Sequence, residues 1–359
     1  MTTKDRLLAF YRHESDERIP LAAYDTLLPR GNVERALRNQ GLGLLKTCPV
    51  SNLISPSFIT RPCGPIANVE VTLREAYEEG EMTIVRTFDT PVGRVFEKYR
   101  KDREYGTMWI KKYLIEEPAD YAVVRFIVQN STLSEQGAAY QLACNDLGDD
   151  GLVLAMVDRT PFQKVLWELT GLERLLFDLH DNRSMVEDLL KAIEYQLDVA
   201  YTLAGTSPAE VIWSPDNLTG DICSPSIYLE YHLNYYRRWA RLLHEAGKVY
   251  AVHMDGRLRS LLDAIGETPV DVIESFSLPM AGGDLPIVDA LTAWNGKSIA
   301  MNLPASLCYK EERHVRTFVS DLLVALHGKG SCMLQVSENL PPSGWQQCLS
   351  YVVDAANGG

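Results

Sequence analysis

A histidine and two acidic residues stand where two neighbouring β-strands are expected to end. The apolar run Val249–His253 is followed closely by Asp255, and the next apolar run, Val270–Phe276, contains Glu274. In an α/β barrel the active site lies at the carboxyl ends of the strands, so these side chains are expected to converge on one point. An imidazole beside two carboxylates can bind a metal ion or transfer a proton.

Glu274 is notable because an acid interrupts an otherwise apolar strand. Burying a carboxylate without a partner is costly, so Glu274 needs a cation, a hydrogen-bond donor or a proton. A structural ion pair with a basic residue inside the barrel is the alternative to a ligand role. For His253 and Asp255 the alternative is an ordinary turn at the end of a strand.

Polar residues follow two further predicted strands. Glu338 comes just after Cys332–Val336, and Asp216 and Asn217 come just after Glu210–Ser214. Glu338 is a candidate metal ligand, and the alternative is an acid that caps the helix N-terminus near Leu340. Asp216 and Asn217 are expected to hydrogen-bond a substrate, with Asp216 also a candidate for proton transfer; the alternative is an Asx turn.

Three more residues are candidates for substrate binding. Tyr24 ends the first predicted strand, and Arg30 follows it in the next loop. Arg30 can grip a substrate carboxylate through two hydrogen bonds, although a single loop arginine also fits a solvated surface group. Tyr24 and Trp213 are expected to line an aromatic pocket, or else to belong to the core.

Short apolar runs alternate with longer helical patterns from residue 150 onward, which is typical of successive βα units. Helices are expected at Asn182–Leu203 and at Pro225–Ala246, the latter between a capping Ser224 and Gly247. The predicted fold is a (β/α)8 TIM barrel in the α/β class, with its eighth strand not located. The seven located strands are Arg18–Tyr24, Leu152–Val157, Glu210–Ser214, Val249–His253, Val270–Phe276, Ser298–Leu303 and Cys332–Val336.

Residues 65–125 follow a different pattern. Asn68–Thr72 and Met82–Phe88 alternate in the manner of antiparallel strands, and Thr90–Gly93 reads as a turn. We therefore predict a β-rich insertion over one rim of the barrel, within a single domain spanning residues 1–359.

Composition, charge and cysteine usage indicate which partners and which cellular compartment are expected. The chain has 359 residues and a net charge of −13, which disfavours nucleic acid and anionic membrane surfaces as partners. Seven scattered cysteines without CxxC spacing, and the lack of an apolar leader, favour reduced thiols in the cytoplasm. The chain contains no GxGxxG, Walker, GxSxG or HExxH motif, so nucleotide, serine-hydrolase and zincin chemistry lack support.

The order of several short motifs resembles the uroporphyrinogen decarboxylase superfamily, within its branch of corrinoid-dependent methyltransferases. The resemblance spans nearly the whole chain and implies a (β/α)8 barrel. The motifs are Asp5–Tyr11, Glu17–Pro20, Thr90–Gly93, Lys112–Tyr121, Ser214–Gly220, His244–Lys248, His253–Gly256, Asp271–Phe276 and Glu338–Pro342.

The resemblance implies a metal site with an altered ligand set. Thiol-activating members of the branch bind zinc through His-x-Cys and a later Cys, with a glutamate between them. The matching positions here are His253, Asp255, Glu338 and Glu274, so carboxylates replace both thiolates. Such a set suits zinc or another divalent metal, with Asp255 either a ligand or the acceptor that orients His253.

The expected activity is therefore transfer of a methyl group between a small, oxygen-linked donor, such as a methoxylated compound, and a separate corrinoid protein. No part of the chain resembles a corrinoid-binding domain. Transfer in the reverse direction, from the corrinoid to an acceptor, is compatible with the same barrel.

Two alternatives stay open. One is a metal-free decarboxylase in which Asp216 or His253 handles protons. The haem-pathway decarboxylase, however, carries an arginine-rich loop after its first strand, and only Arg30 stands there in this chain. The other is a barrel kept as a non-catalytic accessory subunit. A homodimer is compatible with each of these functions.

Overall fold

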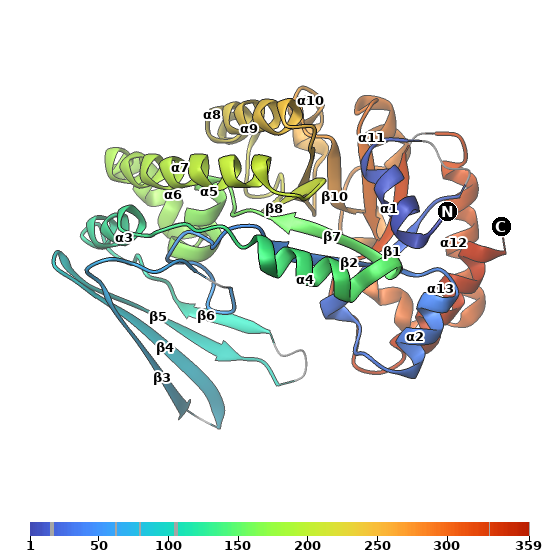
Figure 1. The fold of residues 1–359 in the computed structure, drawn as a ribbon, viewed down its shortest axis with the longest axis horizontal. Coiled ribbons are helices and arrows are strands. Elements are labelled where there is room, and N and C mark those ends of the chain that lie inside the picture. Colours follow the sequence, from blue (N-terminus) through green and yellow to red (C-terminus); the bar gives the residue numbers. More distant parts are fainter. Residues whose placement is uncertain (15–17, 62, 79, 104–106, 330, 359) are drawn as a thin grey trace. The chain divides into compact units, whose positions relative to one another are not determined.

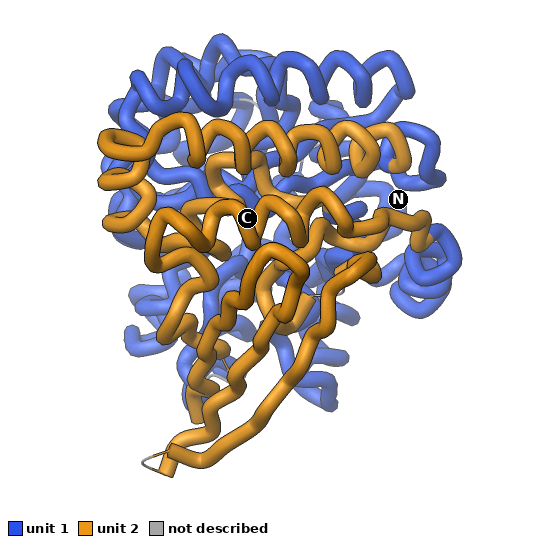
Figure 2. Tube along the Cα trace, turned by 90° about the vertical axis from the view of Figure 1, so that its left-hand side faces the viewer, with its two compact units in different colours: residues 1–50, 137–156, 204–359 blue, residues 51–136, 157–203 orange. Residues whose placement is uncertain are grey.

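The computed structural model describes residues 1–14, 18–61, 63–78, 80–103, 107–329 and 331–358. The chain folds into two compact units, which are coloured separately in Figure 2. The first unit comprises residues 1–50, 137–156 and 204–359, and the second comprises residues 51–136 and 157–203.

The first unit contains a closed barrel of eight parallel strands (Figure 1). Around the barrel the strands follow the order β1-β12-β11-β10-β9-β8-β7-β2. The predicted α/β barrel is therefore confirmed. The strands are β1 Leu21–Tyr24, β2 Gly43–Pro49, β7 Gly151–Met156, β8 Val211–Leu218, β9 Val249–Met254, β10 Val272–Ser277, β11 Ser298–Asn302 and β12 Cys332–Val336.

Burial follows from this topology, because a parallel strand in a barrel is covered on both faces. Every residue of β7, β10, β11 and β12 is buried. Nearly continuous apolar runs therefore made most of the strands recognisable. The polar residues inside those runs are the ones that need a partner.

Helices of the first unit connect the strands. Thr2 forms a capping box with Asp5 at the start of α1, and Ser224 accepts a hydrogen bond from the amide of Ile227 at the start of α8. The helices are α1 Thr3–Tyr11, α2 Asn32–Asn39, α4 Gly137–Leu147, α8 Pro225–Tyr231, α9 Leu233–Glu245, α10 Leu262–Gly266, α11 Ile287–Ala293, α12 Glu312–Leu326 and α13 Trp345–Asn357.

The second unit contains a four-stranded antiparallel sheet in the order β3-β4-β5-β6. This sheet confirms the β-rich character predicted for residues 65–125, although residues 79 and 104–106 lie outside the described part. Its position over a barrel rim stays a prediction. The strands are β3 Glu70–Glu78, β4 Glu81–Thr90, β5 Gly93–Lys101 and β6 Met108–Lys112. The helices of this unit are α3 Asp120–Gln129, α5 Pro161–Lys164, the π-helix η3 Val165–Thr170, α6 Leu172–Asp181 and most of α7 Arg183–Thr206.

The structure corrects two details of the prediction. The strand that the sequence did not reveal is β2, which carries Lys46 and ends at Pro49. The single helix expected over Pro225–Ala246 is two helices, because His232 leaves the helical conformation between α8 and α9. The motif residue Glu17 lies outside the described residues.

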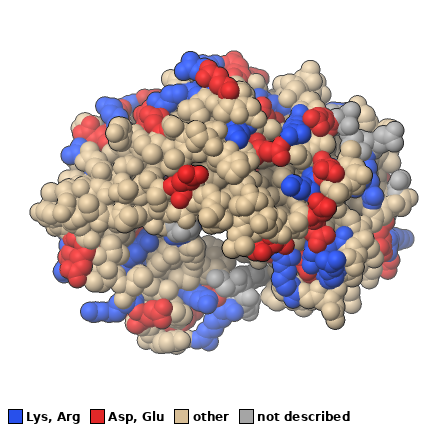
Figure 3. Space-filling model, viewed as in Figure 1, with Lys and Arg blue, Asp and Glu red and all other residues tan. Residues whose placement is uncertain are grey.

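On the face seen in Figure 3, acidic and basic side chains are interspersed and separated by wide uncharged areas. Among the helices that the structure describes, none is both long and apolar enough to cross a membrane.

Candidate functional site

Five polar side chains meet inside the barrel around Glu274. They come from β1, β8, β9, β10 and β12, and strands such as β1 and β8 are not neighbours in the sheet. Side chains from non-neighbouring strands can meet only through the barrel interior. The five are Tyr24, Trp213, His253, Glu274 and Gln335.

The Glu274 carboxylate accepts four hydrogen bonds. Its Oε2 lies 2.6 Å from Nδ1 of His253 and 3.0 Å from Nε1 of Trp213. Its Oε1 accepts a hydrogen bond from the Tyr24 hydroxyl at 2.5 Å and another from the Gln335 amide. Since the side chain is fully buried, these donors replace the water that an exposed carboxylate would bind.

Glu274 is held as a carboxylate. Burial by itself raises its pKa, but the positive charge of His253 and the hydrogen bonds from His253, Tyr24 and Gln335 outweigh that effect. The pKa of Glu274 is therefore below its ordinary value. An ionised carboxylate is an acceptor only, so Nδ1 of His253 must carry the proton between them.

Nε2 lies on the opposite side of the His253 ring from this pairing. Nε2 lies 3.9 Å from Oδ2 of Asp255, whose side chain is 38% exposed. The Trp213 ring meets the His253 ring edge to face, with 5.9 Å between the centroids. The imidazole is thus oriented by Glu274 on one side and faces a partly solvated carboxylate on the other.

Two of the strands that carry these side chains have an irregular backbone. The register of β10 against β11 shifts between Ile273 and Phe276, and Ser275 has a φ of 65°. The register of β8 against β9 shifts between Ser214 and Leu218, where Asn217 has a φ of 51°. Left-handed conformations are unfavourable for residues other than glycine, and bulges of this kind re-aim side chains next to functional sites.

Asp216 lies in β8 and contacts a helix of the first unit, and the substrate-binding and proton-transfer roles predicted for it stay predictions. Its carboxylate is fully buried and accepts a hydrogen bond from the Tyr236 hydroxyl on α9 at 2.6 Å. The side chain therefore points toward the helix layer. Asn217 follows it at the left-handed turn of β8 and is partly exposed.

Arg30 is already engaged by carboxylates. Its Nη1 donates to Oε1 of Glu34 at 2.7 Å, and its Nη2 lies 3.8 Å from Oδ2 of Asp25. A substrate carboxylate would have to compete with Glu34, which is buried. The clamp role predicted for Arg30 stays a prediction.

Glu338 acts as a cap, but on a different segment from the one expected. Its Oε1 accepts a hydrogen bond from the amide of Ala305 at 2.6 Å, at the start of the short 3-10 helix η6 Ala305–Tyr309. An acid at a helix N-terminus is favourable because it satisfies an otherwise unpaired amide. Glu338 thereby joins the segment after β11 to the segment after β12.

The described residues do not fit the predicted set of four metal ligands. All four hydrogen bonds at Glu274 come from protein donors, and Glu338 is used as a cap. Within the described ranges, no group of three or more His, Cys, Asp or Glu side chains is arranged to hold a metal ion. Of the four, His253 lies near both Glu274 and Asp255, with its Nε2 3.9 Å from Oδ2 of Asp255.

Sequence reasoning missed Gln335. It is fully buried, and its amide donates to Glu274 from β12. The signal was present, because a polar residue interrupts the apolar run Cys332–Val336 as Glu274 interrupts its own strand. The same burial argument applies to both.

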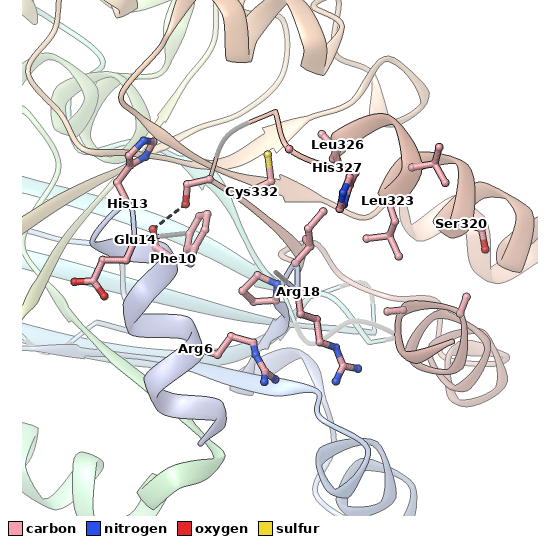
Figure 4. A pocket seen from close by; sticks show the side chains of 17 residues that line it. Arg6, Phe10, His13, Glu14, Arg18, Ser320, Leu323, Leu326, His327 and Cys332 are labelled. Carbon is pink, nitrogen blue, oxygen red and sulfur yellow. Dashed lines mark hydrogen bonds between the residues drawn. The ribbon is translucent and has the colours of Figure 1, made fainter. Parts of the chain in front are cut away.

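A separate cavity of about 560 Å³ lies at the other end of the barrel (Figure 4). Pro20, which precedes β1, and Cys332, the first residue of β12, line it, so it lies by the amino ends of the strands. Arg6, Arg18 and His327 also line it. In barrel enzymes that end contributes to stability, whereas the chemistry lies at the opposite end.

Comparison with known proteins identifies a solved structure with a similar fold. No family model matches the chain, and no curated protein matches its sequence. Among solved structures, a methyltransferase from Methanosarcina mazei matches with a TM-score of 0.58 and 11% sequence identity. The match covers 100% of this chain and 99% of that one. At this identity the likeness shows a shared fold, a barrel that a methyltransferase also uses.

Proposed function

We propose that this chain is a methyltransferase component that moves a methyl group between a small oxygen-linked donor and a separate corrinoid protein. The observation that carries the proposal is the His253–Glu274 pair, with Nδ1 of the histidine fixed 2.6 Å from the carboxylate. The full-length fold likeness to a methyltransferase supports the class of reaction.

Cleaving an oxygen-to-methyl bond requires help at the oxygen. When the methyl group leaves, the electron pair of the C–O bond stays on the oxygen, and a proton must neutralise it. A histidine with one nitrogen fixed by a carboxylate can deliver that proton from its other nitrogen. In this site Nε2 of His253 would donate it, and the donor would leave as an alcohol or phenol.

The corrinoid would come from another chain and supply the nucleophile that accepts the methyl group. This chain's residues would orient the donor and control the proton. Glu274 would stabilise the protonated imidazole, and Asp255 would accept a hydrogen bond from Nε2 between turnovers. Tyr24 and Trp213 would present their ring faces to the donor, because their polar atoms are used on Glu274.

Proton transfer fits these residues better than the expected metal activation. Zinc or another divalent ion would have His253 Nε2 and Asp255 as ligands, with Glu274 as the acceptor that orients the histidine. Two protein ligands are fewer than the three or four of ordinary zinc sites. Metal activation stays a competing prediction, and metal analysis of the purified protein distinguishes it from proton transfer.

The test is methyl transfer to a cobalt(I) corrinoid from a panel of methoxylated donors, with wild type beside His253→Gln. The matched control is His180→Gln, the same change at a histidine whose side chain is 87% exposed. General acid catalysis contributes about 10²- to 10⁴-fold, so we expect a loss of that size in His253→Gln only.

Three outcomes would count against parts of the proposal. Full activity in His253→Gln would remove the histidine from the mechanism. Stoichiometric zinc in the wild type, lost in His253→Gln, would replace proton donation by metal activation. Release of carbon dioxide from a carboxylated substrate, without methyl transfer, would favour the decarboxylase alternative.

A further inference from the structure

We propose that Cys308 and Cys348 form a reversible disulfide that ties η6 to α13. Both residues belong to the first unit, and all seven cysteines of the chain are reduced in the structure. Cys308 lies in η6, which follows β11, and Cys348 lies in the first turn of α13. This inference goes beyond the proposed function and does not depend on it.

The two backbones approach closely at this point. A Cβ atom at Gly344, the residue before α13, would lie 3.3 Å from the carbonyl oxygen of Cys308. The amide of Cys348 donates to the carbonyl of the same Gly344 at 3.1 Å. Cys348 is thus one helical turn from the contact, and its thiol forms a hydrogen bond with the Cys308 sulfur.

The hydrogen bond makes the two thiols unequal. It lowers the pKa of Cys308, although burial and the nearby charge of Glu338 act in the opposite direction. The same hydrogen bond, together with burial, raises the pKa of Cys348. Cys308 is also partly exposed whereas Cys348 is buried, so Cys308 would react first as the thiolate.

Four other cysteines have raised pKa values. Burial raises the pKa of both Cys223 and Cys332 to about 12, and both are buried. Burial also raises the pKa of Cys48 and of Cys63. Thiolate character and access decide which cysteine reacts, so a partly exposed thiol of lowered pKa such as Cys308 is favoured over these four.

The oxidant would be a small disulfide such as oxidised glutathione. The Cys308 thiolate attacks one sulfur of that disulfide and releases one glutathione as a thiol. The Cys348 thiol loses its proton to solvent, attacks the Cys308 sulfur of the mixed disulfide and releases the second glutathione. Two protein thiols are oxidised, and one glutathione disulfide is reduced.

The link would act on a segment at the carboxyl end of the barrel. Glu338 already holds the first residue of η6 through the Ala305 amide. A disulfide at Cys308 would fix the same short helix to α13 from its other end. The position of the segment after β11 would then depend on the thiol state.

The experiment is treatment of the folded, full-length chain with excess oxidised glutathione, followed by intact mass and peptide analysis. We expect the wild type to lose two hydrogens and yield the Cys308–Cys348 peptide pair. Cys348→Ser should stop with one glutathione on Cys308, and Cys308→Ser should carry no glutathione on Cys348. Cys332→Ser should behave as the wild type.

Three results would overturn the proposal. They are a wild-type chain that stays fully reduced, one that retains glutathione on Cys308, and a disulfide between other cysteines. Because each variant is judged by its covalent product, none of these results depends on methyl transfer activity.

Discussion

Each of the two units buries a carboxylate, but the partners differ in kind. In the second unit Glu168 accepts from Lys164 at 3.0 Å, Arg159 at 3.1 Å and Arg61 at 3.3 Å. In the first unit Glu274 meets one titratable cation, His253, and otherwise neutral donors.

The partners decide what each carboxylate can do. Burial by itself raises the pKa of Glu168, but Lys164, Arg61 and Arg159 outweigh it and hold that pKa far below its usual range. Lysine and arginine keep their protons in such a pair, so the Glu168 cluster is a fixed structural element. A histidine changes its charge near neutral pH, so the Glu274 cluster is suited to moving a proton.

The largest effect on stability is expected in the second unit. Lys164 is fully buried and also bonds Oδ2 of Asp158 at 3.0 Å. Lys164→Met removes the shared cation from two buried carboxylates, which should cost about 3 to 5 kcal/mol in the free energy of unfolding. Urea denaturation monitored by circular dichroism measures it. Exposed Lys191→Met is the matched control, with a change within about 0.5 kcal/mol. Equal stability of the two variants would show that the Glu168 cluster is not a structural element.

A smaller and pH-dependent effect is expected at Glu274. Its pKa is lowered in the folded chain, so its charge contributes stability that is present above the unfolded value of about 4.5 and is lost as pH falls through the folded pKa. Glu274→Gln should cost about 2 kcal/mol at pH 7, because a buried charged acceptor is lost. The difference from the wild type should shrink as the pH falls below about 4.5.

Chemical denaturation across this pH range checks the prediction, with exposed Glu245→Gln as the control. A difference that stays constant down to acidic pH would mean that Glu274 is not ionised in the folded chain. It would then resemble a neutral hydrogen-bonded group, and the contrast with Glu168 would disappear.

The sequence predicted the barrel because its strands are apolar runs followed by helical patterns. It did not reveal β2, where Lys46 and the terminal Pro49 break the apolar run. It placed His253, Glu274 and Tyr24 at strand ends and Trp213 in an aromatic pocket or the core, and these four residues do meet.

The details of the site depend on contacts that local sequence does not encode. Gln335 lies 61 residues from Glu274, and only closure of the barrel brings them together. The strand predicted to end at Ser214 continues to Leu218 through a register shift, which turns Asp216 toward Tyr236. A one-residue shift changes the face on which every following side chain lies, and spacing alone does not predict it.

In the proposed mechanism, ionised Glu274 keeps a proton on Nδ1 of His253, and Nε2 is the nitrogen that would donate a proton to the methyl donor. Nitrogen NMR of protein labelled in the histidine rings tests this directly, with His253→Gln to assign the signal. We predict a protonated Nδ1 near neutral pH in the wild type, lost or shifted in Glu274→Gln. An unprotonated Nδ1 that is unchanged in Glu274→Gln would contradict the account.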